Sequence, residues 1–451
     1  MDAGRGARHE QAMAQAAKLY GAGRAEEARE ICEAILRDDP RHFWALHLSA
    51  AIALRNREFD RCISHASRAL ELQPRNAEVL ANRGAAYRRV NRLDEALADY
   101  DRALAADPGY VPAFVNRGVA LAALNRHAEA IASYDQALAL QPGNAAARYH
   151  RALSRLVSGD LAGGFDDYEA RYGGWEGQLP RRATPVPEWS GREPLAGRSI
   201  LVHAEQGLGD SIQMLRYAPL LHARGATVHV EMPASLRAIA NAVPGVSSVT
   251  VSGEAAPATD FHVPTMSLPR AFGTRLDSIP GGVPYIAADA SRVAHWRGRL
   301  PAGRKRLGIA WSGNPGHVND SNRSIALADL APLAATGVEV VALQKDLRPG
   351  DAELLDRLGW RHFGGELHDF TDTAALLSCV DRVITVDTSI AHLAGAMGLE
   401  TRLMLPFSPD WRFLLDRADT PWYPTMRLFR QPSIGAWAPV LERIRDEGWG
   451  V

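Results

Sequence analysis

Asp387, Thr388 and Ser389 stand where a strand pattern changes into a helix pattern, and their carboxylate and hydroxyl groups suit phosphate chemistry. The run 383–386 before them is β-branched and typical of a strand buried on both faces, and helical spacing of apolar residues begins at Ile390. The free N–H groups and the positive dipole end of such a helix attract anions. The three side chains can instead cap the helix, which would make the turn purely structural.

A second stretch with the same character is Gly207-x-Gly209-Asp210. The two glycines permit a tight turn and a close approach of a ligand to the backbone. Asp210 then opens a helix, where it is a candidate general base that takes a proton from an acceptor hydroxyl. Aspartate is also a favoured helix N-cap, which is the structural alternative. His203 and Glu205 are nearby alternatives for the base.

Two further stretches carry the cations that a phosphate-bearing ligand requires. Arg323 ends the polar loop 311–324 and can pair with both oxygens of a diphosphate, while Ser312 and Asn314 offer hydrogen bonds in the same loop. Lys345 follows another apolar run, where it can meet a phosphate as a point charge. A solvated arginine on a surface loop and a lysine at an ordinary strand end are the structural alternatives.

The sequence offers no metal site beside these stretches. The second half of the α/β region contains no Asp-x-Asp motif, and no group of His and Cys residues has metal-ligand spacing. We therefore expect no metal and no resident cofactor, so helix ends, Arg and Lys would neutralise a phosphate. Asp410, Trp411 and Arg412 follow another strand pattern and can border the same ligand, although we expect Trp411 to serve packing.

From residue 199 onward, strand and helix patterns alternate, which predicts parallel sheets with helices on both faces. We expect strands at 199–204, 227–231, 248–251, 261–263, 307–311, 338–343, 382–386, 401–405 and 426–429. The region divides into two predicted domains, 198–300 and 301–451. Because ligands bind at the carboxyl ends of parallel strands, the stretches described above should meet in a cleft between the two domains.

The first part of the chain is periodic. Pro40, Pro74, Pro108 and Pro142 are 34 residues apart, and small and aromatic residues recur with the same period. This pattern resembles the tetratricopeptide repeat and implies an α-solenoid. We place the array at 1–175 and a connector at 176–197. Within the array, the predicted units are 9–42, 43–76, 77–110 and 111–144, with a degenerate cap at 145–171.

The repeats also predict a binding surface, because side chains on the concave face of a solenoid are not needed for its core. Asn82 and Asn116 occupy the same repeat position on that face, and His150 follows them. An asparagine amide offers both a donor and an acceptor to an extended peptide, whatever its sequence. Solvated polar residues on a helix surface are the alternative. We expect the array to bind a polypeptide.

Composition limits the other partners. The 51 basic and 52 acidic residues nearly cancel, so no overall field favours nucleic acid or an anionic membrane. Cys32, Cys62 and Cys379 are far apart and odd in number, which fits a reducing compartment. The first residues lack the apolar core of a signal peptide, and no run is long enough to span a membrane. We expect a cytoplasmic protein.

Taken together, the motifs resemble those of bacterial glycosyltransferases with the glycosyltransferase-B architecture and an amino-terminal tetratricopeptide array. The Gly207-x-Gly209-Asp210 turn and the segment from Asp387 through His392 to Gly398 resemble the paired signatures of the heptosyltransferase-like family. Repeats followed by two Rossmann-like domains are similar to the plan of O-GlcNAc transferases and flagellin glycosyltransferases. The resemblance extends over nearly the whole chain.

This resemblance implies roles for particular residues. It implies Asp210 as the catalytic base, Thr388, Ser389 and His392 around the phosphates of a nucleotide-sugar, and Lys345 and Arg323 as supporting cations. It also implies that the second α/β domain binds the nucleotide-sugar. Members of this group often carry a lysine where this chain has His317 and Val318, so the phosphate would depend more on Arg323.

The predicted function is metal-independent, inverting transfer of a sugar from a nucleotide donor to a serine or threonine hydroxyl of a protein held by the repeats. Flagellin is an acceptor by resemblance only. One alternative keeps the donor but uses a cell-envelope carbohydrate as the acceptor. The other is an adaptor whose transferase half is inactive. The sequence names neither the nucleotide base nor the sugar, and it leaves the oligomeric state open.

Overall fold

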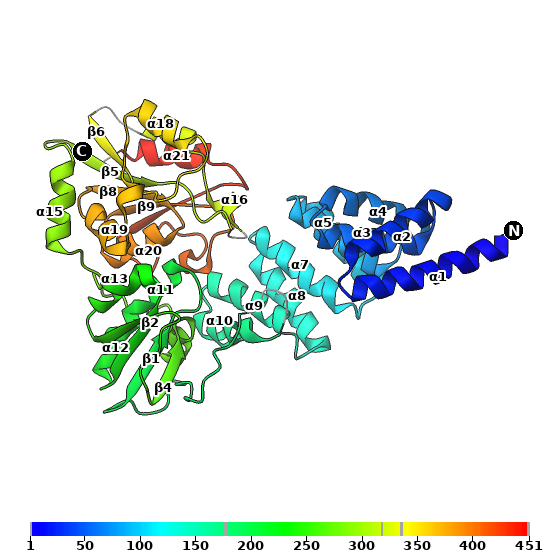
Figure 1. The fold of residues 1–451 in the computed structure, drawn as a ribbon, viewed down its shortest axis with the longest axis horizontal. Coiled ribbons are helices and arrows are strands. Elements are labelled where there is room, and N and C mark those ends of the chain that lie inside the picture. Colours follow the sequence, from blue (N-terminus) through cyan, green and yellow to red (C-terminus); the bar gives the residue numbers. More distant parts are fainter. Residues whose placement is uncertain (1, 175–178, 317–318, 334–336, 449–451) are drawn as a thin grey trace. The chain divides into compact units, whose positions relative to one another are not determined.

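The structure, a computed structural model, describes residues 2–174, 179–316, 319–333 and 337–448 (Figure 1). The chain divides into two compact units. The helical unit comprises residues 1–155 and 173–176, and the α/β unit comprises residues 156–172 and 177–451. In the described part of the chain, no helix is both long enough and apolar enough to cross a membrane.

Consecutive helices of the helical unit pack against one another from α1 to α8. Their bounds are α1 (Asp2–Gly21), α2 (Ala25–Asp38), α3 (Phe43–Arg55), α4 (Phe59–Leu72), α5 (Ala77–Arg89), α6 (Leu93–Ala106), α7 (Val111–Ala123), α8 (His127–Leu140) and α9 (Ala145–Val157). The first helices of neighbouring pairs also touch, as α5 touches α7. The apolar core therefore runs from pair to pair, as expected for stacked repeats.

The 34-residue period has a backbone cause as well as a packing cause. Gly23, Arg57, Asn91, Asn125 and Gly159 all have positive φ, with values of 80°, 64°, 59°, 57° and 91°. Each lies two residues after the first helix of a pair. Glycine and asparagine adopt this left-handed conformation at little cost, and it ends a helix. The period thus places the same turn after each first helix.

Close helix contacts recur with the same period. An added Cβ on Gly84 would lie 2.7 Å from the ring of Tyr100, and the next unit repeats this contact between Gly118 and Tyr134. Tyr100 and Tyr134 are both buried. Only glycine leaves room for a tyrosine ring at this distance, so the small and the aromatic positions predicted from the repeat depend on each other.

The first half of the α/β unit contains a parallel four-stranded sheet in the order β3-β2-β1-β4. Its strands are β1 (Ser199–His203), β2 (Thr227–Met232), β3 (Val246–Val251) and β4 (Phe261–Pro264), and its helices include α11 (Leu208–Met214) and α13 (Arg237–Asn241). The segment before β1 extends the sheet, because Trp189 N–H donates to His262 O at 2.8 Å. Trp189 is buried, and its indole N–H donates to Glu193 O at 3.0 Å, so this side chain helps to hold the segment in place.

The second half contains a parallel six-stranded sheet in the order β10-β9-β8-β5-β6-β7, which is the doubly wound Rossmann order. Its strands are β5 (Lys305–Ala310), β6 (Val338–Ala342), β7 (Arg361–His362), β8 (Arg382–Val386), β9 (Thr401–Leu405) and β10 (Met426–Arg430). All except β7 were predicted. The chain is therefore a helical array followed by two parallel-sheet α/β domains, which confirms the predicted fold class and is consistent with glycosyltransferase-B.

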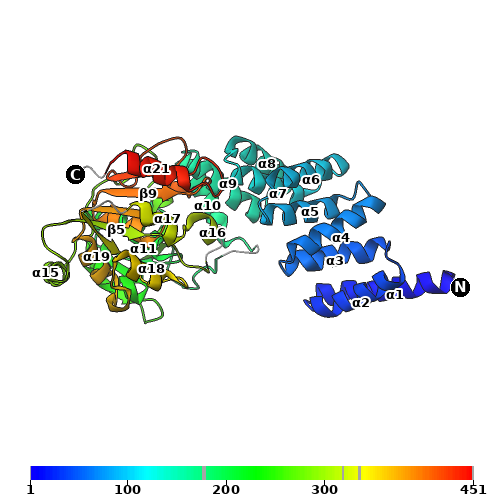
Figure 2. The ribbon, with the colours of Figure 1, turned by 90° about the horizontal axis from the view of Figure 1, so that it is seen from above.

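Helices cover both faces of the second sheet (Figures 1 and 2). On one face, apolar residues of β5, β6, β8, β9 and β10 share a core with α17 (Leu327–Leu330), α18 (Asp351–Leu358) and α21 (Ala438–Asp446). On the other lie α19 (Phe370–Leu377) and α20 (Ser389–Ala396). These two helices meet the first half, since α11 packs against α20 and α13 against α19.

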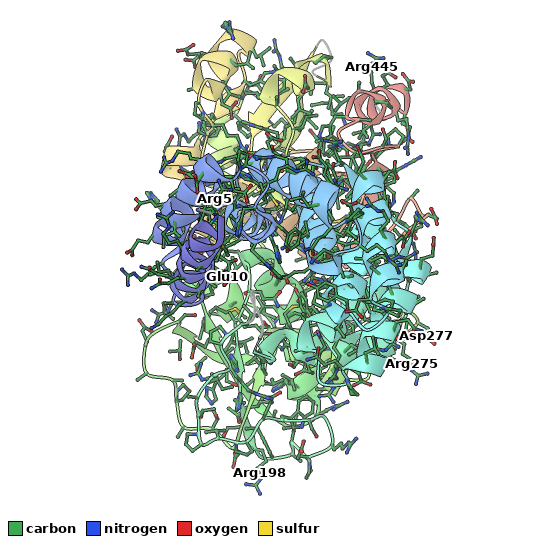
Figure 3. The ribbon with its side chains drawn as sticks, turned by 90° about the vertical axis from the view of Figure 1, so that its right-hand side faces the viewer. Arg5, Glu10, Arg198, Arg275, Asp277 and Arg445 are labelled. Atoms are coloured by element: carbon green, nitrogen blue, oxygen red, sulfur yellow. The ribbon has the colours of Figure 1, made fainter. Side chains whose placement is uncertain are left out.

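Charged side chains of both signs lie around the periphery of each unit (Figure 3). Arg5 and Glu10 are exposed in the helical unit, and Arg198, Arg275 and Asp277 are exposed in the α/β unit. This mixture agrees with the near balance of charge in the sequence. Charge that matters for a site must therefore be sought where it is buried or lacks a partner.

Candidate functional site

The predicted phosphate-binding stretches meet where β5 and β8 end side by side. The strand order runs outward from β5 to β7 on one side and from β8 to β10 on the other, so the switch point of the sheet lies between β5 and β8. Ligands of doubly wound sheets bind at that point. Arg323, from the loop after β5, donates through Nη1 to the backbone oxygen of Asp387, after β8, at 3.1 Å.

The first turn of α20 is not capped by the side chain of Thr388. Thr388 is the N-cap residue, with φ −144° and ψ 177°, and its backbone oxygen accepts from Ala391 N–H at 3.0 Å. Its side chain does not cap the helix, and Thr388 Oγ1 is buried without a hydrogen-bond partner among the described residues. The structural alternative, in which these side chains cap the helix, therefore does not hold for Thr388.

Two more buried polar atoms near this edge lack a hydrogen-bond partner within the described ranges, namely Ser312 Oγ and Arg323 Nε. The guanidinium of Arg323 lies close over Gly313, where an added Cβ would come within 2.5 Å of Nη2. Its side chain is only 16% exposed, and Nε is 3.6 Å from Asp320 Oδ1. A buried polar atom without a partner costs free energy, so a polar ligand here would be stabilising.

The surroundings of Asp387 shift the pKa of its carboxyl group strongly. Burial, followed by the neighbouring Asp410 carboxylate, raises its pKa to about 7, while Arg323 and Arg412 act in the opposite direction. The side chain is 16% exposed. Carboxyl groups that resist ionisation near neutral pH concentrate at functional sites, although structural networks produce them too.

His392 links the two halves of the α/β unit. Its Nδ1 lies 2.8 Å from Tyr423 Oη, and its Nε2 lies 3.8 Å from Asp387 Oδ1. Burial, with Arg412 second, holds the pKa of His392 well below its usual range, so the ring is neutral. Its edge packs against Gly209, where an added Cβ would lie 2.5 Å from His392 Cδ2. Glycine at 209 thus allows α11 and α20 to approach.

Arg412 is the residue that joins the two predicted motifs most directly. It is 4% exposed and makes ion pairs with Asp210 and with Asp410, the latter at 2.9 Å. Its Nε donates to Gln213 Oε1. Burial opposes the charge, but the two carboxylates raise the pKa of Arg412 above its usual value. The sequence suggested only that Arg412 borders the ligand, and nothing in it pointed to Gln213.

Asp210 has a defined structural role as well as a possible catalytic one. The helix α11 begins at Leu208 with Gly207 as its N-cap, so Asp210 is the third helical residue and not the N-cap. Its Oδ2 accepts from Gly207 N–H at 2.8 Å, and its Oδ1 pairs with Arg412. The side chain remains 20% exposed. Each oxygen keeps a free lone pair, because a carboxylate can accept about four hydrogen bonds.

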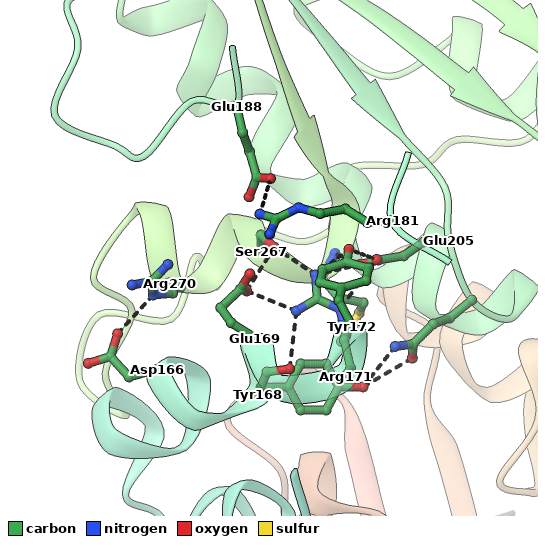
Figure 4. A network of polar contacts seen from close by, with 12 residues as sticks. Asp166, Tyr168, Glu169, Arg171, Tyr172, Arg181, Glu188, Glu205, Ser267 and Arg270 are labelled. Atoms are coloured by element: carbon green, nitrogen blue, oxygen red, sulfur yellow. Dashed lines mark hydrogen bonds and ion pairs between the residues drawn. The ribbon is translucent and has the colours of Figure 1, made fainter. Parts of the chain in front are cut away.

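The two alternative bases are engaged elsewhere, and Figure 4 shows the contacts of Glu205. Glu205 pairs with the buried Arg171 at 3.0 Å, and it also accepts from Tyr172 Oη and from Met266 N–H. It therefore joins the short helix Glu169–Tyr172 to the strand ends of the first sheet within the α/β unit. His203 contacts the ring of His262 at 3.2 Å, and burial lowers the pKa of His203 to about 3. Both geometries favour Asp210 over these residues as the base.

Other predicted residues are less clearly part of one site. Ser389, the first residue of α20, is half-buried. Asn314 is exposed, and its Oδ1 accepts from Gly316 N–H at 2.9 Å. Lys345 is exposed beyond β6, with no recorded side-chain contact to the other site residues in the described ranges. His317 and Val318 lie outside the described residues.

The helical unit holds the other predicted residues. Asn82 and Asn116 are half-buried on α5 and α7, and within the described ranges neither amide has a recorded hydrogen-bond partner. His150, on α9, stacks on Tyr134 with ring centroids 6.1 Å apart. Among the described residues, no group of three or more His, Cys, Asp or Glu side chains is placed to hold a metal ion.

Known proteins resemble different parts of the chain. Residues 77–110 and 111–144 match the tetratricopeptide repeat family. Protein FlbA of Caulobacter vibrioides is 26% identical over 323 residues, which cover 66% of this chain and 54% of that protein. The chain therefore spans about half the length of this relative.

Among solved structures, TTC0263, a thermophilic tetratricopeptide-repeat protein of Thermus thermophilus, is 24% identical with a TM-score of 0.33. The match covers 37% of this chain and 91% of that one. PilW, a type IV pilus biogenesis factor, is 26% identical with a TM-score of 0.34 and covers 37% of this chain and 83% of that one. The chain is thus a tetratricopeptide-repeat protein with two Rossmann-like α/β domains, a glycosyltransferase-like architecture and a distant homologue in FlbA.

Proposed function

We propose that this protein is an inverting, metal-independent glycosyltransferase that moves a sugar from a nucleotide donor to a serine or threonine hydroxyl of a polypeptide held by the repeats. The observation that carries the proposal is the uncapped start of α20, where Thr388 Oγ1 is buried without a partner among the described residues and Arg323 lies next to it. A diphosphate would accept hydrogen bonds from these groups and from the helix N–H groups.

The proposed reaction needs a base and a stabilised leaving group. Asp210 takes the proton of the acceptor hydroxyl, whose oxygen attacks the anomeric carbon of the sugar. The bond from that carbon to the phosphate oxygen breaks, and its electron pair leaves with the nucleoside diphosphate. The α20 dipole and Arg323 stabilise the negative charge that develops there. Arg412 and Gly207 N–H each hold one oxygen of Asp210 and so fix its direction.

A nucleotide screen tests the donor site. We expect one of UDP, CMP, GDP or ADP to raise the melting temperature of the full chain, since ligand at about 100 times its Kd adds about 2.7 kcal/mol. Thr388→Ala and Arg323→Ala should each abolish most of that shift. Arg357→Ala removes an exposed arginine of α18 and is the matched control. No shift with any nucleotide at millimolar concentration would contradict the donor site.

Catalysis requires a separate test. Asp210→Asn should reduce donor turnover by about 10²-fold or more while leaving nucleotide binding within about twofold. Asp277→Asn, at an exposed surface position, should change neither. An adaptor without catalysis is the second candidate, favoured by the ion pair that already occupies Asp210. Nucleotide binding without turnover in the wild type would favour the adaptor.

A further inference from the structure

Arg88 differs from three other arginines on the first helices of the repeats, namely Arg83, Arg117 and Arg151. Arg83, Arg117 and Arg151 each pair with an aspartate of a neighbouring helix, at 2.7, 2.7 and 2.6 Å. No ion pair is recorded for the Arg88 guanidinium anywhere in the described residues. Arg88 is nevertheless half-buried, near the end of α5. No carboxylate therefore makes an ion pair with Arg88 within the described residues.

The groups that surround Arg88 are neutral hydrogen-bonding groups. Arg88 interacts electrostatically with Tyr100, Tyr134 and His150, which come from α6, α8 and α9. One buried donor of this cluster, Arg88 Nε, lacks a hydrogen-bond partner in the described part of the chain. Leaving a donor unsatisfied away from water costs free energy, and a bound acceptor would remove that cost.

The protonation states of the neighbours suit an anion. Burial raises the pKa of Tyr100 to about 12 and also raises the pKa of Tyr134, so both phenols keep their protons near pH 7. Burial, with Arg88 second, lowers the pKa of His150 to about 4, so its ring is neutral near pH 7. The cluster thus has one formal positive charge, from Arg88, which one carboxylate would neutralise.

We propose that Arg88, Tyr100, Tyr134 and His150 form a subsite for the carboxylate of an aspartate or glutamate in a polypeptide bound along the first helices of the repeats. The inference rests on the part of the proposed function that assigns polypeptide binding to the repeats. Asn82, on the same helix as Arg88, and Asn116, on the neighbouring α7, would hold the peptide backbone. The subsite would then select among peptides that the amides cannot distinguish.

The subsite occurs once in the array. The positions 34 residues before and after Arg88 are Leu54 and Ala122, neither of which carries a charge. A guanidinium binds a carboxylate through two parallel hydrogen bonds, so it fixes the register of the peptide as well as adding affinity. One acidic residue at one position of the bound peptide is therefore the expected requirement.

Selection from a random peptide library tests this requirement. Displayed random dodecapeptides are selected on the immobilised full chain and, in parallel, on Arg88→Gln and Arg117→Gln. We expect wild type and Arg117→Gln to enrich one acidic position, and Arg88→Gln to lose that enrichment. Arg117 is the matched control because it also lies on the first helix of a repeat but is already paired with Asp101. The same acidic motif on Arg88→Gln would overturn the proposal.

Affinity measurements make the test quantitative. A fluorescein-labelled selected peptide and its amide version, Asp→Asn or Glu→Gln, are titrated with each variant by fluorescence anisotropy. The amide swap should weaken binding to wild type about 10-fold, as expected for a charged hydrogen bond, and should have no effect on Arg88→Gln. Arg88→Lys keeps the positive charge but cannot form two parallel hydrogen bonds to a carboxylate. The effect of the amide swap on this variant should therefore lie between its effects on wild type and on Arg88→Gln. A swap that costs less than about twofold in wild type would overturn the proposal.

Two controls separate this inference from other failures. Thermal unfolding of Arg88→Gln shows whether the array remains folded. If it does not, Arg88→Lys replaces Arg88→Gln in the binding measurements. Nucleotide binding is measured on the same preparations, so a lost donor site is distinguishable from a lost peptide site. If wild type selects no peptide while its nucleotide response is intact, peptide binding by the repeats is overturned and the donor site stands.

Discussion

Ion pairs are built differently in the helical unit and in the α/β unit. In the helical unit, Arg117 pairs at 2.7 Å with Asp101, only 16 residues earlier in the chain, and the two side chains are 26% and 58% exposed. In the α/β unit, Arg171 and Glu205 are 1% and 8% exposed, and Arg412 reaches Asp210 across 202 residues. The array is held by many local contacts, whereas the α/β unit depends on a few buried cations that join distant segments.

The largest expected effect follows from removing one of those cations. Arg171→Met leaves Glu205 and Glu169 buried without a positive partner, so we expect the free energy of unfolding of the α/β unit to fall by about 3–5 kcal/mol. Denaturant titration followed by circular dichroism and tryptophan fluorescence measures it. Adding Glu205→Gln to Arg171→Met should recover part of the loss, because it removes one uncompensated charge. A loss below about 1 kcal/mol would contradict the contrast between the units.

The next effect compares two glycines that each face an aromatic ring. Gly209→Ala pushes a Cβ against His392, between the two halves, and Gly118→Ala pushes one against Tyr134, within one repeat. We expect each to cost about 1–3 kcal/mol, the first in the unfolding of the α/β unit and the second in that of the array. Thermal denaturation of both variants measures this. Gly365→Ala, with nothing within 4 Å of an added Cβ, is the control.

The fold was predictable because its signals are local. The runs 382–386 and 401–405 were predicted as strands and are β8 (Arg382–Val386) and β9 (Thr401–Leu405), since buried parallel strands give continuous β-branched or apolar runs. The strand β7 is two residues long, Arg361 and His362, which is too short for any periodicity. Its existence follows from pairing with β6, which a local pattern does not encode.

The site was predictable only in part, for the same reason. The rule that ligands bind at strand ends brought Arg323 and Asp387 to one edge of one sheet, where the structure has them hydrogen-bonded. The pair of Arg412 and Asp210 joins two sheets, and side-chain pairing over 202 residues leaves no spacing pattern. Whether Thr388 caps its helix depends on its rotamer, which the residue type does not fix.

The free energy of unfolding should also change with pH in opposite directions in the two units. In the α/β unit the pKa of Asp387 is raised from 3.8 to about 7, chiefly by burial, so between about pH 4 and pH 7 the folded state holds a proton that the unfolded chain has lost. The free energy of unfolding therefore falls as pH rises through this window, by about 1.4 kcal/mol for each pH unit at most.

Asp387→Asn should flatten that slope, which denaturant titrations at pH 5, 6 and 7 would measure. In the helical unit, the hydrogen bond from Arg29 lowers the pKa of Glu58, and the one from His47 lowers that of Glu78. A carboxyl group whose pKa is lowered in the folded state stabilises the fold at pH values above its pKa in the unfolded chain. This stabilisation is lost only in acid, below about pH 4.5. An equal slope in wild type and Asp387→Asn would show that Asp387 is not the group responsible.

The smallest expected effect is that of removing an exposed ion pair from the helical unit. Arg117→Gln removes a pair whose members are partly solvated, so we expect a loss of only about 0.2–1 kcal/mol in the unfolding of the array. Salt should separate the two kinds of pair, because the Debye length at 1 M is about 3 Å and exposed charges are screened while buried ones are not. The Arg117→Gln loss should disappear in 1 M NaCl, and the Arg171→Met loss should persist. If both losses persist in salt, the ion pair of Arg117 is shielded from solvent like that of Arg171. The contrast between exposed pairs in the array and buried pairs in the α/β unit would then be wrong.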